Sequence, residues 1–455
     1  MYKKRIFPSG WMLLLSILMA GRLNAQLSLS AQLRTRSEFR DGQGAPLSKG
    51  LSGAFFTSQR SRLTANFSMY RLKFGLSLQD VRVWGQDVST INRSTAQTNN
   101  NLLLHEAWAE ILLTDTTLKN KSLSLKIGRQ ELVYDDQRLL GNLDWLQQGR
   151  RHDAALLKYE AGNWLFHLGA AYNQNQENAA GTIYNATPPG NYTASTNGGT
   201  MYKSMQFLYA GKKWTAGNLS FLFFADQFSK YHMDTVNNVA AKAFQTGTWS
   251  RATTGLYFTD KFRHTTLTAS GYYQFGKNAS GQNLSAGLLS GAVQQDLSGR
   301  FSLTAGVDFT SGSSTSSTSH TFDPLYGTPH KFWGLMDYFY ASSNFGKGGL
   351  VDFYLKAKYK WNEKLLLSAD LHQFNSASRV LIPTDPSNTG KSLGQELDIV
   401  GTYVLTGQIS FEAGYSHYRS TALLTSVNVK NIANARSDAN WAYIMINIRP
   451  SFLFK

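Results

Sequence analysis

Two patterns in the sequence contain residue types that can do chemistry. The first is Gly390-Lys391-Ser392-Leu393-Gly394, which matches the G-x-S-x-G nucleophile elbow of hydrolases. That elbow needs a strand before the serine and a helix after it, whereas this pentapeptide leads into a strand-like alternation, so we interpret the match as chance. The nine histidines show no H-E-x-x-H spacing, and the absence of cysteine excludes thiolate nucleophiles and Cys-ligated zinc. The sequence therefore predicts no catalytic residue, no metal site and no cofactor.

The second pattern is a set of cationic side chains at a spacing of two residues. Arg34, Arg36 and Arg40 share one parity of the segment 26–40, and the other parity is mostly apolar. A period of two places alternate side chains on opposite faces of a strand, so these arginines share a face that can bind carboxylates. The charged residues that we assign to this polar face or its rim are Arg34, Arg36, Arg40, Arg60, Arg62, Arg71, Lys73, Arg82 and Lys126, mixed with Glu38, Glu106 and Glu110.

This basic face has two interpretations. Either it is the polar lining that any porin lumen needs, or it is a track for polyanions. One arginine at 4 Å from a carboxylate gives about 4 kcal/mol at an effective dielectric of 20, so a few strong sites would trap a chain. Transport instead needs many weak sites, and interspersed carboxylates weaken each one. Nucleic acid is excluded as the partner, because the charge forms no basic block.

The composition and the first residues indicate an exported, folded protein. The chain has 455 residues and a net charge of +16, and its 13% aromatic content with only 9 prolines excludes collagen-like and disordered classes. Lys3, Lys4 and Arg5 precede an apolar stretch at residues 11–20, which predicts a secretory signal peptide cleaved after Ala25. This stretch is shorter than the roughly 20 residues of a transmembrane helix. Cleavage would remove four basic residues and leave a net charge of +12.

The elements that must position the cationic face are membrane-crossing strands. After residue 25 no uncharged apolar run approaches 18 residues, which excludes helical spans. Leu27, Leu29 and Leu33 share the parity opposite to the arginines. The reversed orientation would place arginines in lipid, at a cost of about 2–4 kcal/mol each at the bilayer centre. The cationic parity must therefore face an aqueous lumen, and the apolar parity must face lipid.

The same alternation along residues 26–455 predicts an all-β fold, a closed antiparallel transmembrane β-barrel of about eighteen strands in one domain. Short turns alternate with long loops at 176–200, 231–246 and 311–345, which is typical of a barrel with both termini in the periplasm. The apolar phase slips near Gln79 and Asp80, which predicts a β-bulge there. A soluble β-sandwich or β-helix is the competing fold. The expected strands are 26–40, 56–70, 71–85, 102–114, 122–134, 150–160, 163–175, 202–213, 217–230, 247–259, 262–277, 282–296, 299–310, 347–360, 364–376, 392–405, 408–420 and 440–454.

Several motifs resemble the alginate export family of outer-membrane barrels. The resemblance covers most of the mature chain and is strongest at residues 30–155 and 305–340. The motifs that carry it are Leu33-Arg34-Thr35-Arg36-Ser37-Glu38, Gln79-Asp80-Val81-Arg82-Val83-Trp84-Gly85, Glu106-Ala107-Trp108, Gly128-Arg129-Gln130-Glu131, Leu139-Leu140-Gly141-Asn142-Leu143-Asp144-Trp145, Gly149-Arg150-Arg151-His152-Asp153-Ala154, Phe322-Asp323-Pro324-Leu325-Tyr326 and His330-Lys331-Phe332-Trp333-Gly334-Leu335-Met336-Asp337.

The resemblance implies a monomeric eighteen-stranded barrel whose Arg-rich lumen passes an anionic polyuronate without ATP or a cofactor. Arg129 has the parity of the lipid-facing Leu123, Leu125 and Ile127, so a lumen position for it requires a bulge at Gly128. A long periplasmic plug loop is expected for the family, whereas the turn at residues 213–217 is short. The resemblance assigns Arg36, Arg82, Arg129, Asp144, Arg150 and Asp153 to the constriction, and the lumen phase adds Arg34, Arg62 and Lys126 to the substrate-binding set.

Three functions are open at this point. The first is a passive outer-membrane channel for an anionic polysaccharide or oligosaccharide, and the second is a general or anion-selective diffusion porin. The third is an adhesin or a barrel-borne enzyme that acts through the loop at 311–345, which can also fold into the pore as a constriction. The expected partners are the sugar, outer-membrane lipid and lipopolysaccharide, and periplasmic export or uptake proteins.

Overall fold

The computed structural model describes residues 26–85, 102–174, 181, 195–196, 199–236, 238–312, 317–339, 348–382 and 385–454. The signal peptide at residues 1–25 lies outside these ranges and stays a prediction. Much of the loop at 176–200 and parts of the loop at 311–345 also lie outside them. Within the described ranges, no helix has the length and apolar character needed to cross a membrane.

All eighteen expected strands are present and form one antiparallel sheet. A short hairpin of β8 (Ser195–Thr196) and β9 (Gly199–Thr200), the 3₁₀ turn η1 (Pro329–Lys331) and the helix α2 (Ala422–Thr425) lie outside it. The strands of the sheet are β1 (Gln26–Asp41), β2 (Ala54–Met69), β3 (Leu72–Val83), β4 (Leu103–Leu112), β5 (Lys121–Gln130), β6 (His152–Ala161), β7 (Trp164–Tyr172), β10 (Ser204–Trp214), β11 (Gly217–Val236), β12 (Val239–Phe262), β13 (Thr265–Lys277), β14 (Asn283–Asp296), β15 (Phe301–Thr310), β16 (Leu350–Lys360), β17 (Leu365–Ile382), β18 (Asp385–Thr406), β19 (Ile409–Ser420), and β20 (Asp438–Ile448) with its continuation β21 (Ser451–Phe454).

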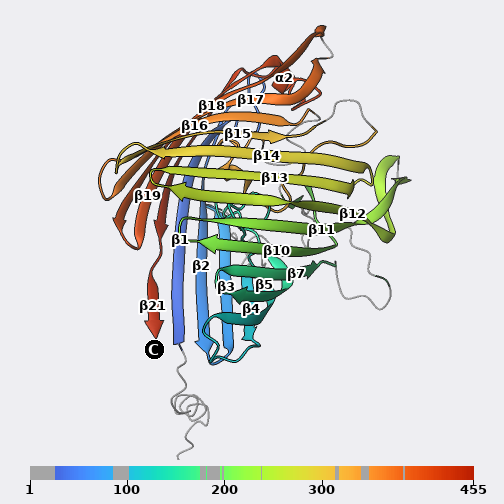
Figure 1. The fold of residues 1–455 in the computed structure, drawn as a ribbon. Helices are drawn as coiled ribbons and strands as arrows, with labels where there is room; N and C mark the ends of the chain where they lie inside the picture. The colour runs from blue at the N-terminus through green and yellow to red at the C-terminus, as the bar shows by residue number, and fades with distance from the viewer. Residues whose placement is uncertain are drawn as a thin grey trace, which may run out of the picture.

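The sheet closes into a barrel because its first and last strands pair (Figure 1). β1 pairs with β2 on one side and with β20 and β21 on the other. Pro450 divides the last strand, since proline has no N–H for the ladder, yet its carbonyl still accepts the N–H of Ala31 at 3.0 Å. The two ends of the sheet therefore pair with each other, as the alternation predicted.

Burial along the strands follows the predicted two-residue period. On β1 Arg34 and Arg36 are each only 3% exposed, whereas Leu33 is exposed. The cationic parity therefore faces the inside of the barrel, and the apolar parity faces outward. Large apolar side chains that are exposed on the outer face recur around the barrel and include Leu63, Leu168, Leu256, Leu289, Leu371 and Ile444.

The bulge predicted near Gln79 and Asp80 is wrong. β3 pairs with β2 in an unbroken register, and the irregularity lies in the pairing of β3 with β4, after Ser77, where His105 is the extra residue. The apolar pattern slips because Asp80 and Arg82 occupy the outer face near the long-loop end of β3. Their side chains form an ion pair at 2.7 Å, which lets two charged groups lie beside the apolar belt.

The loop predicted at residues 231–246 is mostly β-structure. β11 continues to Val236 and β12 begins at Val239, so the two strands form a hairpin beyond the predicted strand ends. Their pairing slips once, between Ser229 and Tyr231. The alternation in this region is more polar than in the apolar belt, so the sequence pattern alone indicates a loop there.

Two segments fold into the barrel and pack against its inner face. Residues 131–151 connect β5 with β6, and residues 317–339 belong to the connection between β15 and β16. They pair through Tyr326, whose N–H donates to Leu139 O at 2.9 Å and whose carbonyl accepts Gly141 N–H at 3.0 Å. The described part of the loop at 311–345 is therefore not an adhesive tip. The apolar core that these segments form with the inner wall includes Leu139, Leu140, Phe207, Phe224, Leu288, Phe322, Leu325, Tyr326, Trp333 and Met336.

Candidate functional site

The inward segment 131–151 is fixed to the wall by buried charge. The Arg138 guanidinium donates from Nη1 to Asp308 Oδ2 at 2.6 Å, and its Nε lies 3.4 Å from Asp136 Oδ2. The same guanidinium lies over the Phe332 ring, 4.0 Å from its centroid. Arg138 and Asp308 are both nearly inaccessible to solvent. A buried ion pair with good geometry resists separation, because either charge left alone would be desolvated without a partner.

A second anchor of the same segment is the Asp135 carboxylate, which accepts hydrogen bonds from Tyr209 at 2.9 Å and Ser220 at 2.8 Å. Burial raises the pKa of Asp135 to about 6, against an ordinary value of 3.8. When segment 131–151 is packed against the wall, the Asp135 carboxyl group thus binds its proton more tightly than it does in the unfolded chain. The contribution of the group to docking is complete below the ordinary pKa and is lost as the pH rises through about 6.

We therefore expect segment 131–151 to be held more tightly at pH 4 than at pH 7. Hydrogen-exchange protection factors for this segment in the detergent-solubilised barrel measure this directly. Asp135→Asn, which mimics the protonated group, should remove the pH dependence. Equal protection of the wild-type segment at the two pH values would show that Asp135 is not the group that controls docking.

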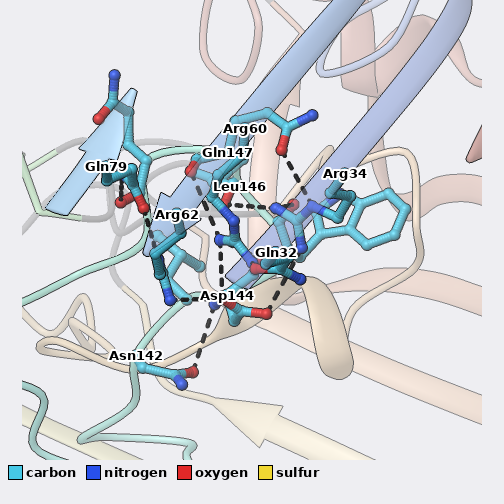
Figure 2. Close-up of polar contacts among 12 residues, drawn as sticks. Gln32, Arg34, Arg60, Arg62, Gln79, Asn142, Asp144, Leu146 and Gln147 are labelled. Atoms are coloured by element: carbon cyan, nitrogen blue, oxygen red, sulfur yellow. Dashed lines mark hydrogen bonds and ion pairs between the residues drawn. The ribbon is translucent and has the colours of Figure 1, made fainter. Parts of the chain in front are cut away.

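The tip of segment 131–151 reaches three arginines on the first two strands (Figure 2). Asp144 Oδ1 lies 2.8 Å from Arg60 Nη1 and 3.8 Å from Arg62 Nη1, and its Oδ2 lies 3.5 Å from Arg34 Nη1. We call Arg34, Arg60, Arg62 and Asp144 the arginine cluster. Arg34 comes from β1 and the other two arginines from β2, where Arg34 and Arg60 are direct partners in the register.

Backbone carbonyls hold Arg34 in place. Its guanidinium donates to Asp144 O at 2.8 Å, Leu146 O at 3.0 Å and Trp145 O at 3.2 Å, and its Nε donates to the Gln147 side chain at 3.0 Å. These bonds satisfy the loop's polar groups without cancelling the charge of Arg34. The arginine therefore fixes the tip of the segment and also keeps a positive potential there.

Arg36 fixes the neighbouring residue of the tip in a similar way. It donates to Trp145 O at 2.9 Å and lies over the Trp145 ring, 4.3 Å from its centroid. Its Nε donates to Glu38 Oε1 at 2.8 Å, so its charge is paired within β1. Arg36 therefore contributes more to holding the tip than to any excess of positive charge.

Positive charge exceeds negative charge in the arginine cluster. One carboxylate faces three guanidinium groups, and the side chain of Asp144 is 37% exposed, against 4% for Arg34 and 1% for Arg60. Burial would raise the pKa of Asp144, but the hydrogen bond and charge of Arg60, with the charges of Arg34 and Arg62, outweigh burial and lower it. Asp144 is therefore ionised at neutral pH, and an added anion can compete with it for the arginines.

Of the three arginines in the cluster, Arg62 is the most accessible to a solute. Its side chain is 14% exposed, and it donates twice to Gln79 Oε1, at 2.6 and 2.9 Å. Its Nη1 also lies 4.0 Å from Glu131 Oε1, a carboxylate that binds His105 and Asn142 more closely, at 2.9 and 2.8 Å. A neutral amide and a distant carboxylate leave the charge of Arg62 only partly compensated.

The family model for alginate export matches residues 25–180 and 223–428 of this chain. The chain belongs to the alginate export family. No curated protein sequence matches this chain significantly.

Solved structures of outer-membrane channels share the barrel's fold. OpdK from Pseudomonas aeruginosa is 12% identical with a TM-score of 0.58, over 94% of this chain and 99% of that one. OccK9 (OpdG) from the same organism is 15% identical with a TM-score of 0.56, over 94% and 98%. OccAB4 from Acinetobacter baumannii is 12% identical with a TM-score of 0.58, over 95% and 99%. With this fold and family, the protein is an integral protein of a Gram-negative outer membrane.

The structure brings together some of the residues predicted for the substrate-binding set. Arg34, Arg62 and Asp144 meet in the arginine cluster, and Arg36 lies beside it on β1. Lys126 faces inward on β5 and is not in contact with the cluster. Arg150 is buried inside the barrel, where its guanidinium donates to the carbonyls of Gly141 and Gly327 and helps join the two inward segments.

Three predicted residues of this barrel lie on its outer face, so their lumen assignment is wrong. Arg82 pairs in register with Gln59, which has the parity opposite to the inward Arg60. Arg129 and Asp153 are direct partners on β5 and β6, and two hydrogen bonds of 2.8 Å join them. Gly128 has a positive φ of 123° but produces no register shift, so the parity of Arg129 stays outward.

The prediction omitted several residues that form the site. The sequence pattern puts Arg60 on the polar face but not in the binding set, although Arg60 makes the shortest contact with Asp144. Gln79 and Gln147 bind Arg62 and Arg34, and Glu131 lies near Arg62. The parity of Arg60 was a usable signal, because it shares a face with Arg62 two residues later. A glutamine in a loop gives no such signal.

Proposed function

We propose that this protein is a passive outer-membrane channel for anionic sugars, with uronate oligosaccharides or polymers as the substrate class. The observation that carries the proposal is the arginine cluster, in which the Asp144 carboxylate at the exposed tip of the inward segment faces Arg34, Arg60 and Arg62, while Glu131 lies 4.0 Å from Arg62. Guanidinium groups bind carboxylates well, and a uronate carries one carboxylate per sugar.

The cluster has the properties of a weak, exchangeable site. Its arginines are held by glutamines and backbone carbonyls, so they present charge without moving when an anion arrives. Such preorganisation reduces the ordering cost of binding. Asp144 competes with each incoming carboxylate, which keeps the affinity low enough for release. A polyanion would therefore advance as each of its carboxylates replaces Asp144 and is replaced in turn.

The family and the fold are those of transport channels and not of enzymes. A second candidate within this class is a general or anion-selective diffusion porin. It is favoured by the burial of Arg34 and Arg60, whose bonds to Asp144 and Gln147 hold the segment in place. Under that alternative the arginines would set the shape of the lumen and would not recognise sugars.

Planar-bilayer recordings of the mature barrel separate these two functions. We expect anion selectivity and block of the ion current by oligogalacturonate. Arg62→Gln removes the most accessible positive charge of the cluster and should weaken the block about fivefold, the effect of a partly exposed ion pair of about 1 kcal/mol. Arg263→Gln, in the exposed turn between β12 and β13, is the charge-matched control and should change nothing.

Two results would contradict the proposal. Cation preference in the wild type, or current that oligogalacturonate does not block, would exclude an anionic-sugar channel. Block by oligogalacturonate that is identical in Arg62→Gln and the wild type would favour the diffusion porin, in which the arginine has only a structural part.

A further inference from the structure

A second group of charged side chains lies on the inner wall at β3 to β6, apart from the arginine cluster. Lys73, Glu110 and Lys126 are direct partners across β3, β4 and β5, so they form one row on the inner face. Lys158 reaches the same row from β6 and approaches Glu110 at 2.5 Å. Three ammonium groups thus lie around the Glu110 carboxylate, and Glu106 and Glu131 add negative charge near Lys126.

Lys126 differs in its contacts from Lys158 and Lys356, which both form ion pairs. Its Nζ lies 3.9 Å from the centroid of the Trp108 ring. Glu110, the nearest candidate counter-ion in the row, is taken by Lys158 and by Ser124, which donates to it at 2.7 Å. Within the described part of the chain, no carboxylate oxygen lies within 4.0 Å of Lys126 Nζ. A cation held by an aromatic ring keeps its full charge, because the ring is neutral.

Glycines on both neighbouring strands make room for this arrangement. A Cβ on Gly75 would lie 2.4 Å from Trp108 Cε2, and one on Gly128 would lie 2.9 Å from Trp108 Cα. Trp108 is the register partner of both glycines, so its indole can lie across β3. The ring is therefore fixed close to the wall, and Lys126 rests on it.

Lys356 on the opposite side of the barrel provides the contrast. It also faces inward beside an aromatic ring, at 5.3 Å from the centroid of Tyr354. Unlike Lys126, it forms an ion pair with a register partner, Asp370, at 2.9 Å. An anion that approaches Lys356 must displace the contacting carboxylate of Asp370, whereas Glu106 and Glu110 act on Lys126 only from beyond 4.0 Å.

We infer that Trp108 and Lys126 form a second carboxylate-binding subsite for the uronate substrate, separate from the arginine cluster. The inference rests on the proposed function, since the substrate class is the same. On β3, Lys73 lies in the row of Lys126 and Gln79 contacts Arg62. These two residues are six positions apart, about 20 Å at 3.3 Å per residue. One oligosaccharide of sufficient length can therefore occupy both subsites, which raises its affinity over that of a monomer.

The test uses Lys126→Met, which keeps an apolar side chain over Trp108 but removes the charge. The readout is the dissociation constant for current block by oligogalacturonate, by galacturonate monomer and by inorganic phosphate, measured in planar bilayers with the mature barrel. Lys356→Met is the matched control, because it also removes one inward positive charge. Lys126→Arg keeps the charge. Heat-modifiable migration on a detergent gel confirms that each variant is a folded barrel.

We expect Lys126→Met to weaken block by oligogalacturonate about fivefold, and Lys356→Met to change it less than twofold. Lys126→Arg should retain wild-type block. The affinity of the galacturonate monomer for the channel should fall much less than that of the oligomer, because the monomer cannot bridge the two subsites. Equal effects of Lys126→Met and Lys356→Met would overturn the inference and indicate that only net charge matters. The inference would also be overturned if Lys126→Met weakened block by phosphate and block by the oligomer equally, since that would indicate a general effect on anions.

Failure of this inference is distinguishable from failure of the proposed function. Suppose that oligogalacturonate blocks the wild type and that Arg62→Gln weakens the block, whereas Lys126→Met does not. The proposed channel function is then supported, and the inferred subsite is wrong. If oligogalacturonate does not block the wild type, the substrate class itself is wrong, and the subsite is wrong with it.

Discussion

Asp144→Asn should tighten the block of the channel by oligogalacturonate about tenfold and lengthen each blocking event. The substitution leaves Arg34, Arg60 and Arg62 without the one carboxylate that faces all three. An ion pair at 4 Å and an effective dielectric of 20 is worth about 4 kcal/mol before screening. Since the Asp144 side chain is 37% exposed, we retain about a third of that value, which corresponds to about tenfold in affinity.

Asp370→Asn is the matched control for this experiment. Asp370 faces inward, and its removal adds the same unit of positive charge, but its partner is the single Lys356 at 2.9 Å. We expect its effect on block to be less than threefold. A tighter block in both variants to the same extent would assign the effect to net charge. A weaker block in Asp144→Asn would contradict the idea that Asp144 competes with the substrate.

The inward orientation of the cluster's arginines could be predicted from their parity on the strands, because a charged side chain that faced lipid would be costly. This argument placed Arg34 and Arg62 correctly, at positions where the opposite parity is apolar. The same argument has no force near strand ends. There the outer face meets polar surroundings, and outward charges such as Arg129 and Asp153 can pair with each other at little cost. The family motifs include both kinds of arginine and do not say which face they occupy.

The partners of the arginines could not be predicted from the sequence. Asp144 and Gln147 lie about 110 residues from Arg34 along the chain, and only the inward fold of segment 131–151 brings them close. That fold depends on apolar loop residues such as Leu139 and Leu140, which lack the periodicity of a strand or a helix. The aromatic residues after Ser311 were a usable signal, since a loop exposed to water would not need them.

The two inward segments also explain how a wide barrel can hold a small charged site rigidly. They fill the lumen beside β10 to β14 with a packed apolar core, and their polar tip faces the arginines of β1 and β2. An eighteen-stranded barrel without such segments would leave a wide aqueous channel. The arginine cluster thus depends on anchors that lie on the far side of the segments from the arginines.

Breaking one of those anchors should loosen the site without unfolding the barrel. Arg138→Met removes one partner of the buried ion pair with Asp308 and leaves the Asp308 carboxylate desolvated without its cation. Loss of one partner of a buried pair costs about 3–5 kcal/mol. We expect the local stability of segment 131–151 to fall by that amount, with faster hydrogen exchange at its amides. Single-channel current should rise and become noisier as the tip leaves Arg34.

The double variant Arg138→Met, Asp308→Leu tests the cause. Replacing both members of a buried pair by apolar residues is often neutral, because no unpaired charge remains. We therefore expect the double variant to recover the protection of segment 131–151 to within about 1 kcal/mol of the wild type and to restore quiet current. If the double variant stays as noisy as Arg138→Met, the stacking of Arg138 on Phe332, and not its charge pair, holds the segment. Protection unchanged in the single variant would mean that the Tyr326 backbone pairing alone is sufficient to hold it.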